Sequence, residues 1–133
     1  AAGVRGIKLK GDDIVVGMGV IETDLAKKKN YQILTIMENG YGKRTNLSLY
    51  KVQGRGGSGI RTAKVTDKTG KIRSAFIIDK DRMKNKDLII ISDEGQVIRV
   101  PYESVNELGR DTQGVRIMRF KNDNDCVASV TYA

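Results

Sequence analysis

An internal repeat is the feature of this 133-residue sequence that most restricts its fold. Aligned with the sequence 55 positions further on, residues 40–61 show six identities without a gap: Gly40 with Gly95, Arg44 with Arg99, Gly54 with Gly109, Arg55 with Arg110, Gly59 with Gly114 and Arg61 with Arg116. A third, partial copy opens the chain with the same residue types, in the order Gly3, Arg5 and Lys8. Repeats of this length are typical of solenoids, propellers and arrays.

Each copy consists mainly of short segments with the composition of β-strands, separated by turn signals such as Asn39-Gly40. The expected strands are 32–37, 60–65, 72–78, 88–91, 96–100, 115–120 and 126–130, and short helical turns are expected over 24–29 and 102–108. About four strands per repeat correspond to one blade of a propeller. We therefore expect an all-β fold, a propeller-like fragment of roughly two and a half four-stranded blades.

The repeat also predicts how the chain is divided. Residues 1–23 are expected to end a preceding blade, 31–79 to form a full blade and 86–133 to form a second full blade. A propeller removes its open sheet edges by closing a ring of several blades, which so few blades cannot do. We therefore expect residues 1–133 to be part of one larger domain.

The net charge of the chain, +8 from 24 basic and 16 acidic residues, is concentrated in one segment. Residues 40–73 contain nine basic residues and one acid, which gives 9 − 1 = +8, and the rest of the chain is balanced. A concentrated positive surface on folded structure favours a polyanion as partner. A solvated face that only keeps the protein soluble is the alternative.

The composition argues against most catalytic and metal sites, because the chain has no histidine and a single cysteine, Cys126. Residues 54–59 match the pattern G-x-G-x-x-G, but a dinucleotide site needs a helix after it, and 60–65 predicts a strand. Residues 122–125 lack the glycine and distal glutamate of a calcium loop and predict a tight turn. No apolar run approaches the roughly 20 residues of a membrane helix, so we expect a soluble protein without membrane contact. The cysteine and histidine content leads us to expect no metal site.

Three segments carry a resemblance to a known family: 40–45 (Gly-Tyr-Gly-Lys-Arg-Thr), 53–60 (Gln-Gly-Arg-Gly-Gly-Ser-Gly-Ile) and 109–116 (Gly-Arg-Asp-Thr-Gln-Gly-Val-Arg). The chain resembles the C-terminal domain of the A subunit of bacterial DNA gyrase, a type IIA topoisomerase, and residues 3–9 and 13–16 resemble the end of a preceding blade in that family. The family folds as a β-pinwheel, a propeller-like disc whose basic rim bends and wraps duplex DNA. This wrapping supports the ATP-dependent negative supercoiling carried out by the whole enzyme.

The charge pattern and the resemblance together predict a set of DNA-binding residues. The set comprises Lys43, Arg44, Lys51, Arg55, Arg61 and Lys64 in the first full blade, Arg99, Arg110 and Arg116 in the second, and Arg5 and Lys8 in the partial one. The loop glycines Gly54, Gly56, Gly57 and Gly59 are expected to shape the loop beside them. Contacts between such cations and phosphates are independent of base sequence. For Arg5, Arg61 and Arg116 the alternative is a structural role, with the stems packed between blades.

The resemblance also implies partners and a location. These are duplex DNA, the remainder of the gyrase A polypeptide, and the gyrase B polypeptide in an A2B2 enzyme in the cytoplasm at the nucleoid. The tyrosine that cleaves DNA, and the sites for ATP and Mg²⁺, belong to other parts of that enzyme, so no catalytic residue and no cofactor is expected in this chain.

One departure from the family pattern leaves alternatives open. The signature box of the family, Gln-Arg-Arg-Gly-Gly-(Lys/Arg)-Gly, is matched only in part at 53–59, where Gly54 and Ser58 stand at basic positions. We therefore expect the true box in an upstream blade. The equivalent domain of topoisomerase IV, which lacks the box, is one alternative. A protein-interaction propeller whose basic face binds an acidic partner is the other.

Overall fold

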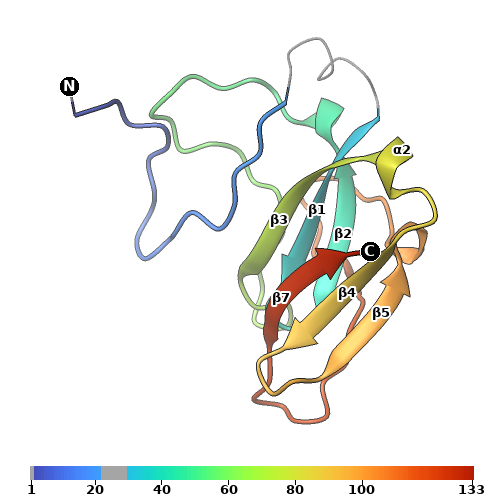
Figure 1. Cartoon of the computed structure of the whole chain (residues 1–133). Coiled ribbons are helices and arrows are strands. Elements are labelled where there is room, and N and C mark those ends of the chain that lie inside the picture. Colours follow the sequence, from blue (N-terminus) through green and yellow to red (C-terminus); the bar gives the residue numbers. More distant parts are fainter. Residues whose placement is uncertain (1, 22–29) are drawn as a thin grey trace.

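Residues 2–21 and 30–133 are described by the computed structural model, and they form antiparallel β-sheets (Figure 1). The strands are β1 (Tyr31–Met37), β2 (Tyr41–Asn46), β3 (Ile72–Asp79), β4 (Asp87–Ser92), β5 (Val97–Pro101), β6 (Val115–Arg116) and β7 (Val127–Tyr132). Within the described residues, helical structure is limited to single turns, which are α2 (Lys80–Met83) and the 3-10 turns η1 (Leu47–Leu49) and η2 (Tyr102–Ser104). The expectation of an all-β fold is confirmed.

The sequence repeat is also a repeat in strand register. One sheet has the order β3-β1-β2-β6 and the other has the order β5-β4-β7. In the first sheet Leu34 of β1 lies opposite Arg44 and Phe76. In the second sheet Ile89 of β4 lies opposite Arg99 and Thr131. Each residue of the second set follows its counterpart by 55 positions, so the two repeats fold into the same three-stranded unit.

The fourth strand of the first sheet comes from the second repeat. In β6, Arg116 pairs with Tyr41 and Val115 pairs with Gly42 of β2. The backbone N–H groups of Ile117 and Met118 then donate to the carbonyl oxygen of Gly40, at 2.8 and 3.1 Å. The expected blades 31–79 and 86–133 are therefore not self-contained units, because the second supplies a strand to the first.

A shared core joins the two sheets. Its fully buried side chains come from both repeats: Leu34, Ile36, Ile78, Met83, Leu88, Ile90, Tyr102, Val105, Met118 and Val127. Each of them is less than 5% exposed. Burial of apolar area on this scale is the main stabilising contribution, about 1.5–3 kcal/mol for each large side chain.

The N-terminal segment 2–21 lies apart from the shared core, and most of it extends away from the sheets beside the segment that follows β2 (Figure 1). Its backbone forms one isolated parallel bridge, between Ile7 and Gly57. Further along, Gly17 passes β3 so closely that a Cβ atom there would lie 2.8 Å from the carbonyl oxygen of Ala75. The segment is thus held by the first repeat without forming a strand of its own.

Five of the expected strands are confirmed, namely those over 32–37, 72–78, 88–91, 96–100 and 126–130. The strand expected over 60–65 is absent from the described structure, and the one over 115–120 is reduced to the two residues of β6. The helical turn expected over 102–108 is the three-residue η2, and the one over 24–29 lies outside the described residues.

Candidate nucleic-acid interface

The glycine-rich loop 54–57 is fastened to the N-terminal segment by backbone hydrogen bonds. The N–H of Gly56 donates to the carbonyl of Gly6 at 2.9 Å, and the N–H of Lys8 donates to the carbonyl of Gly57 at 2.8 Å. Gly56 has a φ of +76°, a conformation that favours glycine. We call the contact between residues 5–8 and loop 54–57 the first junction.

One of these two backbone bonds recurs one repeat later. The N–H of Lys64 donates to the carbonyl of Thr112 at 2.9 Å, and these residues correspond in the repeat to Lys8 and Gly57. The guanidinium Nη1 of Arg110 adds a bond of 2.9 Å to the carbonyl of Arg61. We call the contact between residues 61–64 and loop 109–112 the second junction. In both junctions, a segment of one repeat is hydrogen-bonded to the loop of the next, and we call this pairing the clasp.

Seven of the eleven predicted DNA-binding residues lie at or beside the two junctions. Arg5, Lys8 and Arg55 are exposed at the first junction, and Lys51 is exposed just before its loop. At the second junction Arg61 and Lys64 are exposed and Arg110 is half-buried. Of the loop glycines, Gly59 also has a positive φ, +75°, and Gly54 faces open space. The fold thus places cations from two repeats along each clasp.

Lys43 does not share this exposure. Its side chain is 1% exposed, and its ammonium Nζ donates to the carbonyls of Gly109, Arg110 and Thr112 at 2.8, 2.7 and 3.0 Å and to the Thr112 hydroxyl at 2.9 Å. Burial lowers the pKa of this lysine to about 8, while the nearby carboxylate of Asp111 acts in the opposite direction. Lys43 holds the loop of the second junction from inside and has no donor left for a phosphate.

Arg44 is also occupied inside the protein. Its Nε donates to the carbonyl of Val105 at 2.6 Å, and its guanidinium carbon lies 4.8 Å from the centre of the Tyr102 ring. Both partners belong to the second repeat. The expectation that Lys43 and Arg44 contact phosphate therefore does not fit the structure, because β2 is covered on both faces and turns both side chains into the protein.

The two remaining predicted residues are exposed but lie outside the junctions. Arg99 pairs with Asp87 through its Nε at 2.6 Å. Arg116 donates from Nη2 to the hydroxyl of Tyr41 at 3.0 Å and stacks over the same ring at 5.1 Å. This contact is the largest cause of a lowered pKa for Tyr41. Arg116 thus has a hydrogen-bonding partner within the protein, which is a tyrosine hydroxyl and not a loop carbonyl.

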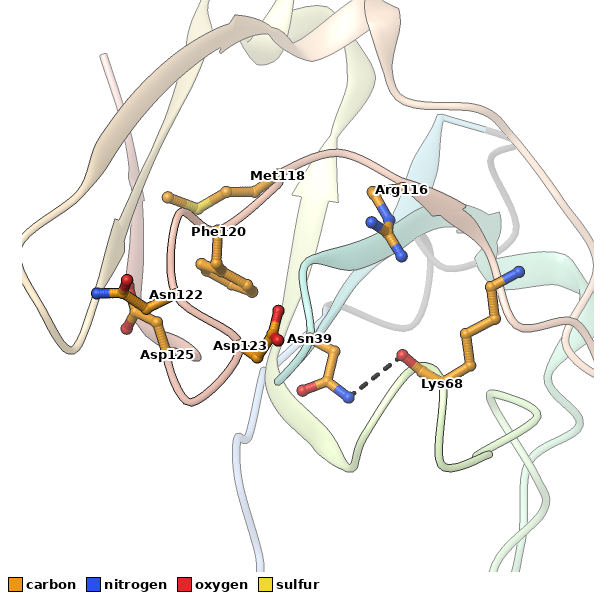
Figure 2. Close-up of a pocket in the computed structure, with 8 residues that line it drawn as sticks. All are labelled: Asn39, Lys68, Arg116, Met118, Phe120, Asn122, Asp123 and Asp125. Atoms are coloured by element: carbon orange, nitrogen blue, oxygen red, sulfur yellow. Dashed lines mark hydrogen bonds between the residues drawn. The ribbon is translucent and has the colours of Figure 1, made fainter.

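A polar hollow of about 230 Å³ lies beside Arg116. Figure 2 shows Lys68 and Arg116 on one side of it and Asn122 and Asp125 on the other, with Asp123 between. The side-chain amide of Asn39 donates to the Lys68 carbonyl at 3.2 Å across its lower edge. Because opposite charges line the hollow, it does not present the uniform positive surface that a phosphate backbone requires.

One residue that affects the interface was not identified from the sequence. Asp111, in the loop of the second junction, accepts from Nη1 of Arg61 at 3.2 Å. The signal was present in the repeat, because position 111 aligns with Gly56 and is the only acid that either loop 54–57 or loop 109–112 contains.

No group of acidic, cysteine or histidine side chains within residues 2–21 and 30–133 is arranged to hold a metal ion. In the same part of the chain, no helix has the length and apolar character needed to cross a membrane.

Repeated three-stranded units, completed by a strand from the next repeat and carrying basic loops at each junction, define a chain of the propeller class. The family model described as "DNA gyrase C-terminal domain, beta-propeller" matches residues 1–22, 32–79 and 86–131. The chain belongs to this family, which confirms the resemblance seen in its glycine and arginine motifs.

Curated relatives and solved structures agree with this assignment. The DNA gyrase A protein of Staphylococcus epidermidis is 37% identical over 98% of the chain, and that of Staphylococcus aureus is 36% identical over 92%. The chain is also similar to a structure of a DNA gyrase A C-terminal domain, with a TM-score of 0.66, 29% identity and coverage of 79% of this chain and 34% of that one. The C-terminal domain of DNA topoisomerase IV shares the fold, with a TM-score of 0.80 at 17% identity over 98% of this chain and 38% of that one. The chain spans only 13–14% of the length of these gyrase A proteins.

Proposed function

We propose that this chain binds duplex DNA through the exposed cations of its two junctions, as part of a gyrase A C-terminal domain that bends and wraps DNA. The observation that carries the proposal is the recurrence of the clasp, which places Arg5, Lys8 and Arg55 on one junction and Arg61, Lys64 and Arg110 on the next. Repeated clusters at the same place in successive repeats suit a ligand with a repeated charge, such as a phosphate backbone.

Contacts of this kind explain bending without base recognition. Bending a short duplex site costs on the order of 1–6 kcal/mol, and additional phosphate contacts recover that cost. Lys51, exposed beside the first junction, extends the positive surface. Arg99 and Arg116 are exposed as well, and the salt bridge of Arg99 is weak enough to exchange for a phosphate.

The activity of the whole enzyme lies beyond these contacts. In the proposal, the chain supports ATP-dependent negative supercoiling as part of an A2B2 gyrase, together with the remainder of the gyrase A polypeptide and with gyrase B, at the nucleoid. The catalytic residues and the sites for ATP and Mg²⁺ lie in other parts of that enzyme, and the chain itself binds no cofactor.

The test is the affinity for a mixed-sequence duplex, measured by fluorescence anisotropy over a salt series. If about six phosphates are neutralised, log K should fall against log salt with a slope near −5. The triple variant Arg5→Ala, Lys8→Ala and Arg55→Ala should reduce that slope by about 3. A matched variant that removes three exposed cations elsewhere, Arg82, Lys84 and Lys121, should change the slope by less than about 1.

A slope near zero, or equal losses in the two triple variants, would overturn the proposal. The alternative of a protein-interaction propeller predicts no affinity for duplex DNA at physiological salt. The topoisomerase IV alternative is separated from gyrase by the sequence upstream, which carries the signature box only in gyrase. The 36–37% identity to gyrase A proteins favours gyrase.

A further inference from the structure

The two junctions share one backbone bond, from Lys8 to Gly57 in the first and from Lys64 to Thr112 in the second, but they differ in charge. At the first, Arg5, Lys8 and Arg55 face solvent, and among the described residues their side chains make no ion pair or hydrogen bond. At the second, the equivalent cations Arg61, Lys64 and Arg110 are accompanied by the carboxylate of Asp111. The first junction therefore carries three cations, and the second carries a net charge of 3 − 1 = +2.

The carboxylate of Asp111 is placed to compete with a phosphate. Its Oδ1 lies 3.2 Å from Nη1 of Arg61, and the two side chains are 66% and 68% exposed. A phosphate oxygen that approached Arg61 would have to displace this carboxylate and would be repelled by it. Exposed ion pairs of this kind are worth about 1 kcal/mol or less, so the competition weakens DNA binding without abolishing it.

Asp111 is not needed to hold the loop in which it lies. The carbonyls of Gly109, Arg110 and Thr112 are held by the Lys43 ammonium, and Thr112 is also held by the backbone N–H of Lys64. Within the described residues, Arg61 is the hydrogen-bonding partner of the Asp111 carboxylate. The charge of Asp111 also favours the Lys43 ammonium, so at a pH well below the pKa of Lys43 a change that removes only this charge should leave the clasp intact.

We infer that Asp111 sets the strength of the second junction for phosphate, making it a weaker contact for duplex DNA than the first. This inference rests on the proposed DNA-binding function.

The test is Asp111→Asn in the 133-residue chain, with the affinity for a mixed-sequence duplex measured over a salt series. The released Arg61 should add about one phosphate contact, so that binding tightens about three- to eightfold near 0.1 M salt and the slope of log K against log salt steepens by about 0.9. Glu103→Gln on η2 is the matched control, because it removes the same charge from an exposed site outside both junctions. This control should change the affinity less than about twofold.

The same substitution in an Arg61→Ala chain tests whether Asp111 acts through Arg61. In Arg61→Ala chains, Asp111→Asn should lose most of its effect, because the guanidinium that it releases is absent. Equal effects of Asp111→Asn and Glu103→Gln, or an undiminished effect in the Arg61→Ala background, would overturn the inference while leaving DNA binding itself in place. Loss of DNA binding by the unaltered chain would instead contradict the proposed function.

Discussion

The guanidinium of Arg44 lies 4.8 Å from the centre of the Tyr102 ring, and this cation–π contact joins the first repeat to the second. Tyr102 is 2% exposed and begins η2, which corresponds in the repeat to η1. The equivalent arginine of the second repeat, Arg99, instead pairs with Asp87 at the surface. Two arginines at the same repeat position thus have different environments.

This difference predicts unequal effects on stability. Arg44→Ala removes the cation–π contact and leaves the carbonyl of Val105 without its donor, so it should lower the free energy of unfolding by about 2–3 kcal/mol. Arg99→Ala removes an exposed pair and should cost less than about 1 kcal/mol. Urea unfolding followed by circular dichroism measures both. Equal costs would show that the Tyr102 contact contributes nothing.

Lys43 predicts a dependence of stability on pH. Its pKa is lowered to about 8 in the folded protein from an ordinary value of 10.5, so between these values the unfolded chain binds more protons than the folded one. Stability rises with pH wherever the unfolded state binds more protons. The contribution of Lys43 should therefore grow from about pH 8 to pH 10.5 and be constant below about pH 7.

The measurement compares wild type with Lys43→Met at about pH 7 and about pH 9.5, so that the other titrating groups cancel. Lys43→Met should be the less stable chain at neutral pH, by about 1–3 kcal/mol, because three carbonyls lose their shared donor. The difference between the two free energies of unfolding should widen at the higher pH. A difference that narrows with pH would mean that Lys43 is not buried as described.

The turn glycines offer a matched pair. Gly40 and Gly95 occupy equivalent turns, with φ of +87° and +88°. A Cβ atom at Gly40 would lie 2.3 Å from the Met118 carbonyl oxygen, whereas one at Gly95 would meet open space. Gly95→Ala should cost only the strain of its backbone, about 1–2 kcal/mol. Gly40→Ala should cost at least about 2 kcal/mol more, measured by thermal unfolding, because it forces the segment after β6 away from the turn.

Cys126 should react slowly with thiol reagents. Its Sγ donates to the Asp93 carboxylate at 2.9 Å, which together with burial raises the pKa of the thiol to about 11. The thiolate is the reactive form, and its scarcity outweighs its higher nucleophilicity, so alkylation by iodoacetamide at about pH 8 should be about tenfold slower than for a free cysteine. Asp93→Asn should restore most of the rate. An unchanged rate in that variant would exclude the carboxylate as the cause.

Much of the fold could be predicted because strand composition and turn signals agree in both repeats. Strand β2 was missed because Tyr41-Gly42-Lys43-Arg44-Thr45 has neither alternation nor an apolar run. It forms a strand because β1 and β6 pair with its two edges and its faces are covered. The same burial explains why the expected contact of Lys43 and Arg44 with DNA does not fit the structure. Charge along a sequence does not show which way a side chain points, and the inward partners of these two, loop 109–112 and Val105, come from the second repeat.

The contribution of β6 to the first sheet has a consequence for how the chain unfolds. Val115 and Arg116 of the second repeat complete the sheet of the first, and one core is shared by both sheets, so unfolding of the second repeat would remove a strand from the first sheet and expose its buried side chains. The two repeats are therefore coupled into one cooperative unit, and a pulling force applied across them would be shared between them before either could open alone.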